Sequence, residues 1–310
     1  LPMKHLGAHG FMDCKNLDPQ LKALFCFGDQ QIFLPHVYRW CRRRRIPFVA
    51  YVGTAHSLDS NFKSKVMNAL FAAGTLRIYK KNPVLAKTSA AKEELRQLGV
   101  PHAVIAPVGL DIAVLKKNIP ADEKMRLRKE HGFEADDVIL CNVSRLSWEK
   151  RPLELIDLFL QVKGKKKFKL IIVGNGPLEE ELNEKIRKNG LEKEVKIYPN
   201  VPYEKMWEIY EMSDYYLNMN KGEIFGMAIM EAVYYKTSVA AIRALGPSVT
   251  LKDMKGHKLC ENDDEMAEWI TGPYPSEKDL QESSEKMAAT FTWDRCADAF
   301  LQASSEKSSR

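Results

Sequence analysis

Two glutamates, Glu223 and Glu231, have the type and spacing most suggestive of chemistry in this chain. Glu231 interrupts an apolar stretch over residues 227–235 that predicts a helix, and Glu223 lies just before it. A helix rises about 1.5 Å per residue, so we expect the carboxylates roughly 12 Å apart. That span suits a nucleotide-sugar, with a sugar hydroxyl at one end, a ribose at the other and a diphosphate between them. Free amides at a helix N-terminus favour the diphosphate. The alternative is a pair of structural surface glutamates, so other segments must supply phosphate ligands.

Two cations, Arg145 and Lys150, lie between a predicted strand over residues 138–143 and a predicted helix over residues 152–162. Ligands of parallel sheets bind beyond the carboxyl ends of strands, which is where these side chains fall. A guanidinium and an ammonium there can hold two phosphates, each charge-assisted hydrogen bond contributing roughly 1.5–3 kcal/mol. Taken alone, the segment is better explained as a basic surface loop.

Two further turns follow predicted strands. Gly174 begins a Gly-Asn-Gly-Pro turn after residues 169–173, where the backbone has room to approach a ligand, although turn geometry alone also explains it. His56 follows the strand predicted over residues 48–52. It is either a hydrogen-bond donor to a sugar or a loop histidine with partners inside the fold.

The elements that must position these residues alternate along the chain. Short apolar runs alternate with longer amphipathic segments, which is typical of parallel sheets built from βαβ units. The predicted strands cover residues 48–52, 76–80, 103–106, 138–143, 169–173, 195–198, 215–217 and 238–241. The predicted helices cover residues 34–44, 60–73, 90–98, 121–130, 152–162, 178–189, 203–212 and 226–235.

A polar stretch near residues 112–121 separates two such patterns. We therefore expect an α/β protein of two doubly wound, Rossmann-like domains facing across a cleft. Residues 1–117 would form the first domain and residues 118–290 the second.

Composition limits the partners and the compartment. The 310 residues suffice for about two domains, and 45% apolar and 28% charged residues are ordinary for a soluble protein. A net charge of +6, without aromatic residues between the basic runs, gives no reason to expect nucleic acid. Six scattered cysteines predict reduced thiols in the cytoplasm, and the histidines lack zinc-ligand spacing. No run reaches the length of a membrane span.

A basic cluster ends the helix predicted over residues 34–44 and consists of Arg42, Arg43, Arg44 and Arg45. Cations suit the carboxyl end of a helix dipole, so a solvated helix end is one interpretation. The other is contact with an anionic membrane surface, worth about 1 kcal/mol per charge.

Taken in order, these segments resemble glycosyltransferase family 4, whose members are retaining enzymes of the two-domain GT-B fold. The resemblance extends over roughly residues 48–300, and each motif is weak alone. The matching pieces cover residues 51–56, 106–111, 143–150, 173–177, 223–226 and 231–232. Trp293 is similar to the start of the family's final helix, so residues 291–310 would return to the first domain as a helix with a polar tail.

The resemblance implies a role for each charged residue. Arg145 and Lys150 would bind the donor diphosphate and stabilise the departing nucleotide. Glu231 would accept hydrogen bonds from the ribose, and Glu223 would contact the donor sugar near its reacting face. His56 would contact that sugar from the first domain.

The resemblance also implies that backbone groups bind the donor. Amides around Phe225, Gly226 and Met227 would hold sugar hydroxyls and phosphate, and Gly174 would lie against the donor. No metal or cofactor is implied, because protein cations neutralise the leaving group. Family members begin with a strand and a Gly-rich loop that residues 1–30 do not show, so the resemblance implies an incomplete first domain lacking on the order of 60 residues.

We therefore expect a metal-independent, retaining glycosyltransferase of hexosyltransferase type. It would move a sugar from a nucleotide-diphosphate sugar, most plausibly a UDP-sugar, to a glycan or lipid-linked acceptor in cell-surface polysaccharide biosynthesis. We expect it in the cytoplasm, peripheral on the inner membrane face. Two alternatives stay open. A nucleotide-sugar epimerase of the same fold needs additional proton-transfer groups, and a non-catalytic donor-binding fragment would suit the shortened start.

Overall fold

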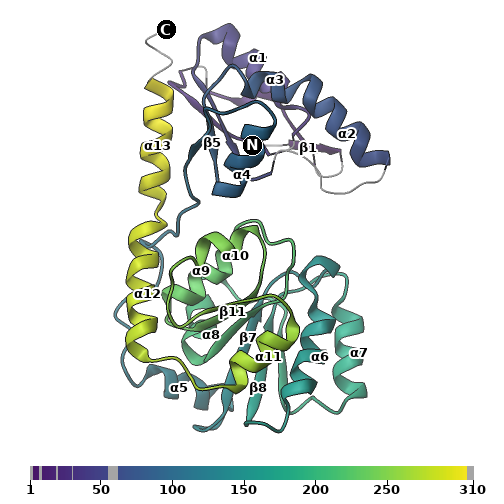
Figure 1. Ribbon diagram of the computed structural model, residues 1–310, viewed down its shortest axis with the longest axis vertical. Coiled ribbons are helices and arrows are strands. Elements are labelled where there is room, and N and C mark those ends of the chain that lie inside the picture. Colours follow the sequence, from purple (N-terminus) through teal and green to yellow (C-terminus); the bar gives the residue numbers. More distant parts are fainter. Residues whose placement is uncertain (1–2, 7–8, 19, 30, 55–61, 306–310) are drawn as a thin grey trace. The chain divides into compact units, whose positions relative to one another are not determined.

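The computed structural model describes residues 3–6, 9–18, 20–29, 31–54 and 62–305 (Figure 1). The chain forms two compact units. Unit 1 contains Leu1–Gly109 and Thr292–Arg310, and unit 2 contains Leu110–Phe291. The division falls at residue 109 rather than at the expected residue 117. Residues 110–117 join unit 2 because the Leu110 amide donates to the Phe291 carbonyl at 2.9 Å, and the Lys116 amide donates to Tyr235 Oη at 3.0 Å.

Unit 1 is built on a four-stranded parallel sheet in the order β3-β4-β5-β6. A β-hairpin of β1 (Met3–Leu6) and β2 (His9–Met12) precedes it. The strands are β3 (Leu24–Phe27), β4 (Phe48–Val52), β5 (Val84–Ala86) and β6 (Val104–Ile105). The helices that follow them in the chain are α1 (Leu34–Arg44), α2 (Phe62–Ala73), α3 (Thr75–Tyr79) and α4 (Ser89–Gln97).

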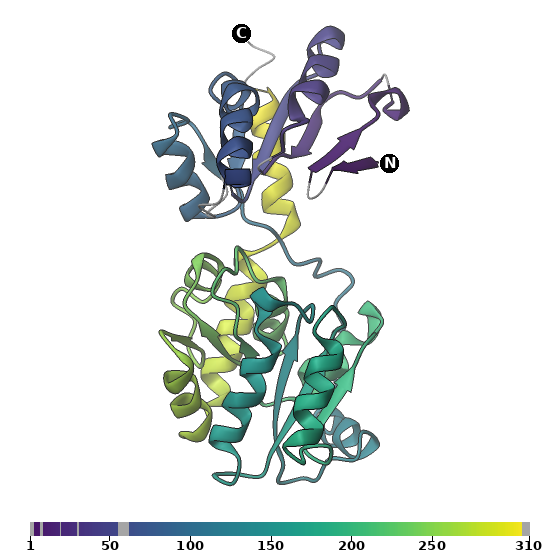
Figure 2. The same ribbon diagram turned by 90° about the vertical axis from the view of Figure 1, so that its right-hand side faces the viewer.

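The two faces of this sheet have separate cores. Apolar side chains of α1, among them Val37 and Cys41, pack with Phe48 on one face. The C-terminal helix α13 (Trp293–Ser305) packs against β4 and β5 on the other face (Figure 2). There the centroids of the Phe300 and Phe25 rings lie 5.0 Å apart. Every residue of β4 is buried, as expected for the interior strand of a covered parallel sheet.

Unit 2 is a six-stranded parallel sheet in the order β9-β8-β7-β10-β11-β12. Its strands are β7 (Val138–Val143), β8 (Phe168–Val173), β9 (Val195–Tyr198), β10 (Tyr215–Asn218), β11 (Ser238–Ile242) and β12 (Lys258–Cys260). This is the 3-2-1-4-5-6 order of a doubly wound Rossmann fold. The order reverses between β7 and β10, so the loops after these two strands diverge and leave a crevice at their carboxyl ends.

Helices cover both faces of the second sheet (Figure 1). One face carries α6 (Pro152–Val162), α7 (Glu179–Lys188) and α11 (Asp263–Thr271), which share a hydrophobic core with the strands. The other helices are α5 (Glu123–Glu130), α8 (Met206–Met212), α9 (Met227–Tyr234), α10 (Leu245–Thr250) and α12 (Glu277–Thr290).

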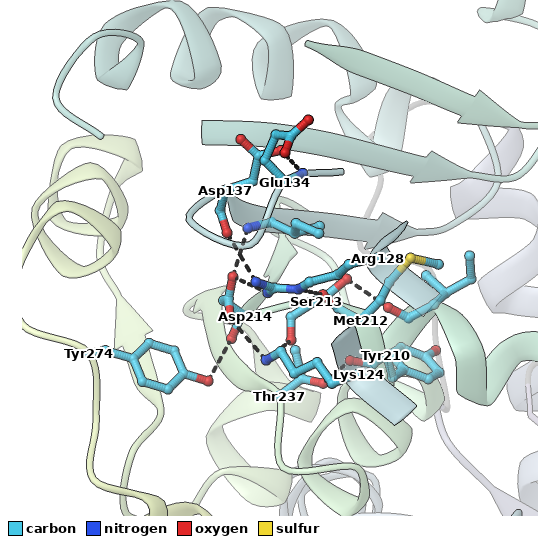
Figure 3. A network of polar contacts seen from close by, with 12 residues as sticks. Lys124, Arg128, Glu134, Asp137, Tyr210, Met212, Ser213, Asp214, Thr237 and Tyr274 are labelled. Atoms are coloured by element: carbon cyan, nitrogen blue, oxygen red, sulfur yellow. Dashed lines mark hydrogen bonds and ion pairs between the residues drawn. The ribbon is translucent and has the colours of Figure 1, made fainter. Parts of the chain in front are cut away.

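A polar network at the start of β10 fixes that strand beside β7 (Figure 3). Asp214 Oδ2 accepts hydrogen bonds from the Ile139 amide at 2.8 Å and from the buried Arg128 guanidinium at 2.6 Å. Lys124 Nζ lies 2.9 Å from Asp214 Oδ1, and Tyr274 Oη donates to the Asp214 carbonyl at 3.2 Å. Because these contacts hold the amino ends of the two strands, the opposite ends are presented side by side.

One predicted strand is wrong. Residues 76–79 lie in helix α3, which Lys80 caps, and the strand of this region is β5, some eight residues later. Leu76, Ile78 and Tyr79 are all buried, so their pattern suits either element, and periodicity cannot separate a short buried helix from a strand. The prediction also missed β1, β2, β3, β5, β12, α10, α11 and α12.

Candidate functional site

The residues predicted to bind a ligand in unit 2 follow the carboxyl ends of three neighbouring strands. Arg145 and Lys150 follow β7, Gly174 follows β8, and Glu223 follows β10. The reversal of strand order lies between β7 and β10, and ligands of open parallel sheets bind at such a reversal. The topology therefore places these side chains at the edge of the sheet where a ligand is expected.

Lys150 and Glu223 form an ion pair across this reversal. Lys150 Nζ lies 2.8 Å from Glu223 Oε2, and the side chains are 25% and 15% exposed. Asn220 Nδ2 donates to the same carboxylate oxygen at 3.1 Å. Burial alone would raise the pKa of Glu223, but hydrogen bonds and charge from Lys150, with the Asn220 and Asn218 amides, lower it below its ordinary value. Glu223 is therefore a fixed anion whose remaining lone pairs can accept hydrogen bonds from the hydroxyl groups of a ligand.

The loop that carries Glu223 is held by its own hydrogen bonds. Asn218 Oδ1 accepts from the Asn220 amide at 3.0 Å, and Asn220 Oδ1 accepts from the Gly222 amide at 2.9 Å. The Gly246 amide donates to the Glu223 carbonyl at 2.8 Å. A Cβ at Gly246 would lie 2.5 Å from the amide nitrogen of Phe225, so only glycine allows this approach.

Gly174 brings the loops after β7 and β8 into backbone contact. Its φ is +138°, in a region that L side chains rarely adopt, and a Cβ there would lie 1.9 Å from the Ser144 carbonyl oxygen. The Leu146 amide donates to the Asn175 carbonyl at 2.9 Å between the same loops. Gly174 thus sets the position of the loop that carries Arg145.

Arg145 and Arg151 of this loop differ in their surroundings. The Arg145 side chain is exposed and makes no hydrogen bond or ion pair with any other residue in the described ranges. Arg151 donates two hydrogen bonds to Asp263, at 3.0 and 2.8 Å, and these raise its pKa. Arg151 therefore anchors the start of α6, while Arg145 has its guanidinium available for a ligand.

Glu231 lies in a different environment, on α9. It is 8% exposed, and Tyr210 Oη donates to its Oε2 at 2.7 Å. Burial raises the pKa of Glu231, although hydrogen bonds from Tyr210 and Tyr203 act in the opposite direction. Glu231 also lines a cavity of about 100 Å³ in unit 2, together with Tyr203, Trp207 and Lys116. Its carboxylate thus faces space in which a hydrogen-bond donor can approach.

The N-terminus of α9 lies between the two glutamates. Gly226 precedes the helix with φ +85°, and the backbone amides of Phe225, Gly226 and Met227 donate no hydrogen bond to the described residues. Such amides can bind oxygen atoms of a ligand. The helix begins only at Met227, so the 12 Å separation expected from helical rise does not apply to residues 223–226.

Two predicted features are outside this site. His56 lies outside the described residues. The basic cluster of Arg42, Arg43, Arg44 and Arg45 lies in unit 1 at the end of α1, where all four side chains are exposed and Arg44 lies 4.6 Å from the Trp40 ring. Among the helices in the described ranges, none has both the length and the apolar composition needed to cross a bilayer.

Several residues that hold the site were not predicted from the sequence. Asn218 ends β10 and Asn220 follows it, and a position at a strand end is the same signal that identified Arg145, so both asparagines could have been found from the sequence. The contact of Tyr210 with Glu231 joins α8 to α9 and leaves no local pattern in the sequence.

Comparison with known proteins bears on both units. The family described as glycosyl transferases group 1 matches residues 123–287, more than half of the chain. The alignment with a D-inositol 3-phosphate glycosyltransferase of Mycobacterium avium (strain 104) runs over 297 residues at 26% identity and covers 84% of this chain and 65% of that protein. An alpha-monoglucosyldiacylglycerol synthase of Streptococcus pneumoniae is 24% identical over 139 residues, 44% of this chain and 32% of that protein.

A solved structure supports the fold. Anabaena HepE in complex with UDP matches with a TM-score of 0.70 at 20% identity, covering 90% of this chain and 76% of that one. The chain spans about two thirds of the length of the mycobacterial relative.

Proposed function

Because this chain belongs to the glycosyl transferases group 1 family and has the GT-B fold, we propose that it is a glycosyltransferase that uses a nucleotide-diphosphate sugar. The observation that carries the proposal is the Lys150–Glu223 pair at the reversal of strand order in unit 2, with Arg145 on the same loop as Lys150 and without an ion-pair partner in the described part of the chain. A UDP-sugar is the first candidate, since the structurally similar HepE was solved with UDP.

The proposed chemistry is leaving-group stabilisation. The bond between the anomeric carbon and the phosphate oxygen breaks, and an acceptor hydroxyl forms the new bond and releases its proton to the departing phosphate. Arg145 and Lys150 supply positive charge where the diphosphate gathers negative charge, so no metal ion is required. Attack from the face that the diphosphate leaves would retain the anomeric configuration. Catalysis then depends on position and charge more than on a covalent intermediate.

The two glutamates hold opposite ends of the donor in this proposal. Glu223, kept ionised by Lys150, accepts a hydrogen bond from the sugar, and Glu231 accepts from the ribose hydroxyls beside its cavity. The free amides of Phe225, Gly226 and Met227 bind oxygen atoms between them. Gly174 keeps the arginine-bearing loop against the donor.

The proposed acceptor is a glycan or a lipid-linked sugar at the inner membrane face, as in cell-surface polysaccharide synthesis. One relative is named for a diacylglycerol lipid. Unit 1 carries 19 Lys and Arg against 9 Asp and Glu, whereas unit 2 carries 28 against 32. The four arginines that end α1 lie in the basic unit. An anionic bilayer attracts such a cluster by about 1 kcal/mol per charge, which supports peripheral attachment of a cytoplasmic protein.

A thermal-stabilisation screen of nucleotide-sugars tests the proposal. A donor at 100 times its dissociation constant adds about 2.7 kcal/mol to the free energy of unfolding. We expect one nucleotide class to stabilise the wild type, and Arg145→Ala and Lys150→Ala to lose most of that shift. Lys188→Ala, an exposed lysine of α7 outside the site, should keep it. If no nucleotide-sugar stabilises the wild type, the proposal is wrong.

NMR of the donor then separates the rival activities. Transfer to an added glycan or glycolipid supports the transferase. A new sugar epimer formed without any acceptor identifies an isomerase. Donor binding without either reaction identifies a binding module.

A further inference from the structure

A second ion pair lies at the carboxyl edge of the sheet in unit 1. Asp29 follows β3 and Lys87 follows β5, and Lys87 Nζ lies 3.1 Å from Asp29 Oδ2. The side chain of Lys87 is 15% exposed and that of Asp29 is 38% exposed. The amide of Gly53, which follows β4, donates to Asp29 Oδ1. Three adjacent strand ends thus hold one carboxylate at the edge where parallel sheets bind ligands.

The backbone of Asp29 is strained. Its φ is +23°, a value that few residues other than glycine adopt. The Tyr79 hydroxyl donates to the Asp29 carbonyl at 3.1 Å, and a Cβ at Gly28 would lie 2.3 Å from that hydroxyl. The hydrogen bond to Tyr79 and the close approach of Gly28 to the same hydroxyl hold this turn in place. An ion pair that only stabilises the fold needs no strain, whereas strain of this kind concentrates at ligand sites.

An exposed aromatic ring lies beside the pair. Phe27, the last residue of β3, is 55% exposed although it is a large apolar side chain. Its ring centroid lies 5.3 Å from that of Tyr51, with an angle of 76° between the planes, and Lys87 Nζ lies 5.5 Å from the Phe27 ring. The ring is thus fixed on one side and open to solvent on another.

We propose that Asp29, Lys87 and Phe27 form a subsite for a neutral pyranose with adjacent hydroxyl groups. A carboxylate only accepts hydrogen bonds and an ammonium only donates them, while a hydroxyl does both. Two neighbouring hydroxyls therefore match this pair, and the apolar C–H face of the sugar can pack on the exposed Phe27 ring. Describing this pyranose as the acceptor sugar rests on the proposed function; the binding itself does not.

The charges in the cluster favour a neutral ligand over a charged one. A carboxylate has about four lone-pair sites, of which the hydrogen bonds from Gly53 and Lys87 use up to three, and an ammonium has three donors. Both groups keep capacity for a ligand. An anion would meet the Asp29 charge and a cation the Lys87 charge, each without a compensating excess of the opposite sign in the pair.

Saturation-transfer NMR with methyl α-glucopyranoside, α-galactopyranoside and α-mannopyranoside tests this on the full chain. We expect transfer to at least one glycoside, and binding about tenfold weaker in Asp29→Asn and Lys87→Met, as for loss of a charge-assisted hydrogen bond. Phe27→Ala removes an exposed side chain and should weaken binding without unfolding the protein. Lys92→Met, an exposed lysine of α4, is the matched control and should bind as the wild type does.

Two results would overturn the subsite: no transfer to any of the three glycosides at millimolar concentration, or unchanged transfer in Phe27→Ala together with either charged-pair variant. Tighter binding of methyl glucuronide than of methyl glucoside would also contradict a neutral site. Stabilisation by the nucleotide-sugar is measured in the same variants and should be unchanged. Glycoside binding without any nucleotide-sugar binding would leave the subsite standing and reject the proposed function, so the two failures are distinguishable.

Discussion

The loop around Glu223 and the helix around Glu231 give the same residue type opposite surroundings within one unit. Glu223 lies in a loop beside a lysine and two asparagines, and its pKa is lowered despite burial. Glu231 lies on α9 beside tyrosines, and burial raises its pKa. A cation compensates the first carboxylate for its lost hydration, whereas neutral hydroxyls compensate the second only in part.

The difference indicates what each carboxylate can do for a ligand. The negative charge of Glu223 is already balanced by Lys150. A ligand is therefore oriented by a hydrogen bond to Glu223 more than it is stabilised by the charge. The ionised form of Glu231 is under-solvated, so donor hydroxyls such as those of a ribose would supply hydrogen bonds that the protein alone does not. The fold thus tolerates a destabilising anion at Glu231 where a ligand would relieve it. Five substitutions can break or sharpen this contrast.

The largest effect is expected at the cation of the first region. Lys150→Ala removes the partner of Glu223. In the proposed reaction it also removes one of the two positive charges that stabilise the leaving diphosphate. We expect turnover at saturating donor to fall by about 10²–10³, comparable to the loss of one oxyanion donor. Steady-state rates with the donor from the screen measure it. Lys188→Ala controls for a general loss of positive charge, and a Lys150→Ala turnover near that of the wild type would remove the contrast.

The second prediction concerns the hydroxyl that supports Glu231. Tyr210→Phe should lower the free energy of unfolding by about 1.5–3 kcal/mol, because a hydrogen bond to a charged group is lost. It should also raise the pKa of Glu231 further. Urea unfolding at neutral pH measures the first effect.

Tyr216→Phe is the matched control for this variant. The Tyr216 hydroxyl donates to the neutral Val143 carbonyl at 3.3 Å, and its loss should cost about 0.5–1.5 kcal/mol. Equal losses in the two variants would mean that the charge of Glu231 plays no part.

Much of this architecture could be predicted from the sequence. The bounds of β4, β7, β9, α1 and α6 match the prediction. Helix α3 could not be separated from a strand, because five residues, four of them buried, are too few to show a period. The resemblance to family 4 glycosyltransferases is confirmed at the level of family and fold.

The contacts within the site were harder to predict from the sequence than the elements that carry them. Lys150 contacts Glu223 because β10 lies next to β7 in the sheet. The local sequence pattern does not predict the order of the strands. The tyrosine beside Glu231 comes from α8, 21 residues earlier, and aligns only when both helices pack on the sheet. Motif spacing identified the charged residues, but their partners required the tertiary structure.

The third prediction addresses the glycine between the two regions. Gly226→Ala should lower the free energy of unfolding by about 1–3 kcal/mol, because φ +85° is strained for alanine and its Cβ would lie 2.7 Å from Ile229 Cδ1. Gly190→Ala has a similar φ of +62° with no atom within 4 Å, so it isolates the backbone strain. Thermal or urea unfolding of both variants gives the difference. A Gly226→Ala loss no larger than that of Gly190→Ala would show that the side-chain contact is unimportant.

The smallest effect, and the most direct test of the contrast, is the pH dependence of stability. The pKa of Glu231 lies above its ordinary 4.5 in the folded state, so its protonated form favours folding. Its stabilising contribution is complete below 4.5 and is lost as pH rises through the folded-state pKa. Glu231→Gln should therefore be more stable than the wild type at neutral pH, and this advantage should shrink on acidification.

Glu223→Gln should show the reverse. The folded-state pKa of Glu223 lies below 4.5, so its contribution is present above 4.5 and is lost as pH falls through the folded-state value. The variant should be less stable than the wild type at neutral pH and approach it in acid. Urea unfolding in steps from neutral pH to about pH 4 compares the two curves. If both variants change stability in the same direction, the two glutamates do not differ as their surroundings indicate. If Glu231→Gln gains stability while losing stabilisation by the nucleotide-sugar, the cost of burying that carboxylate is tied to binding.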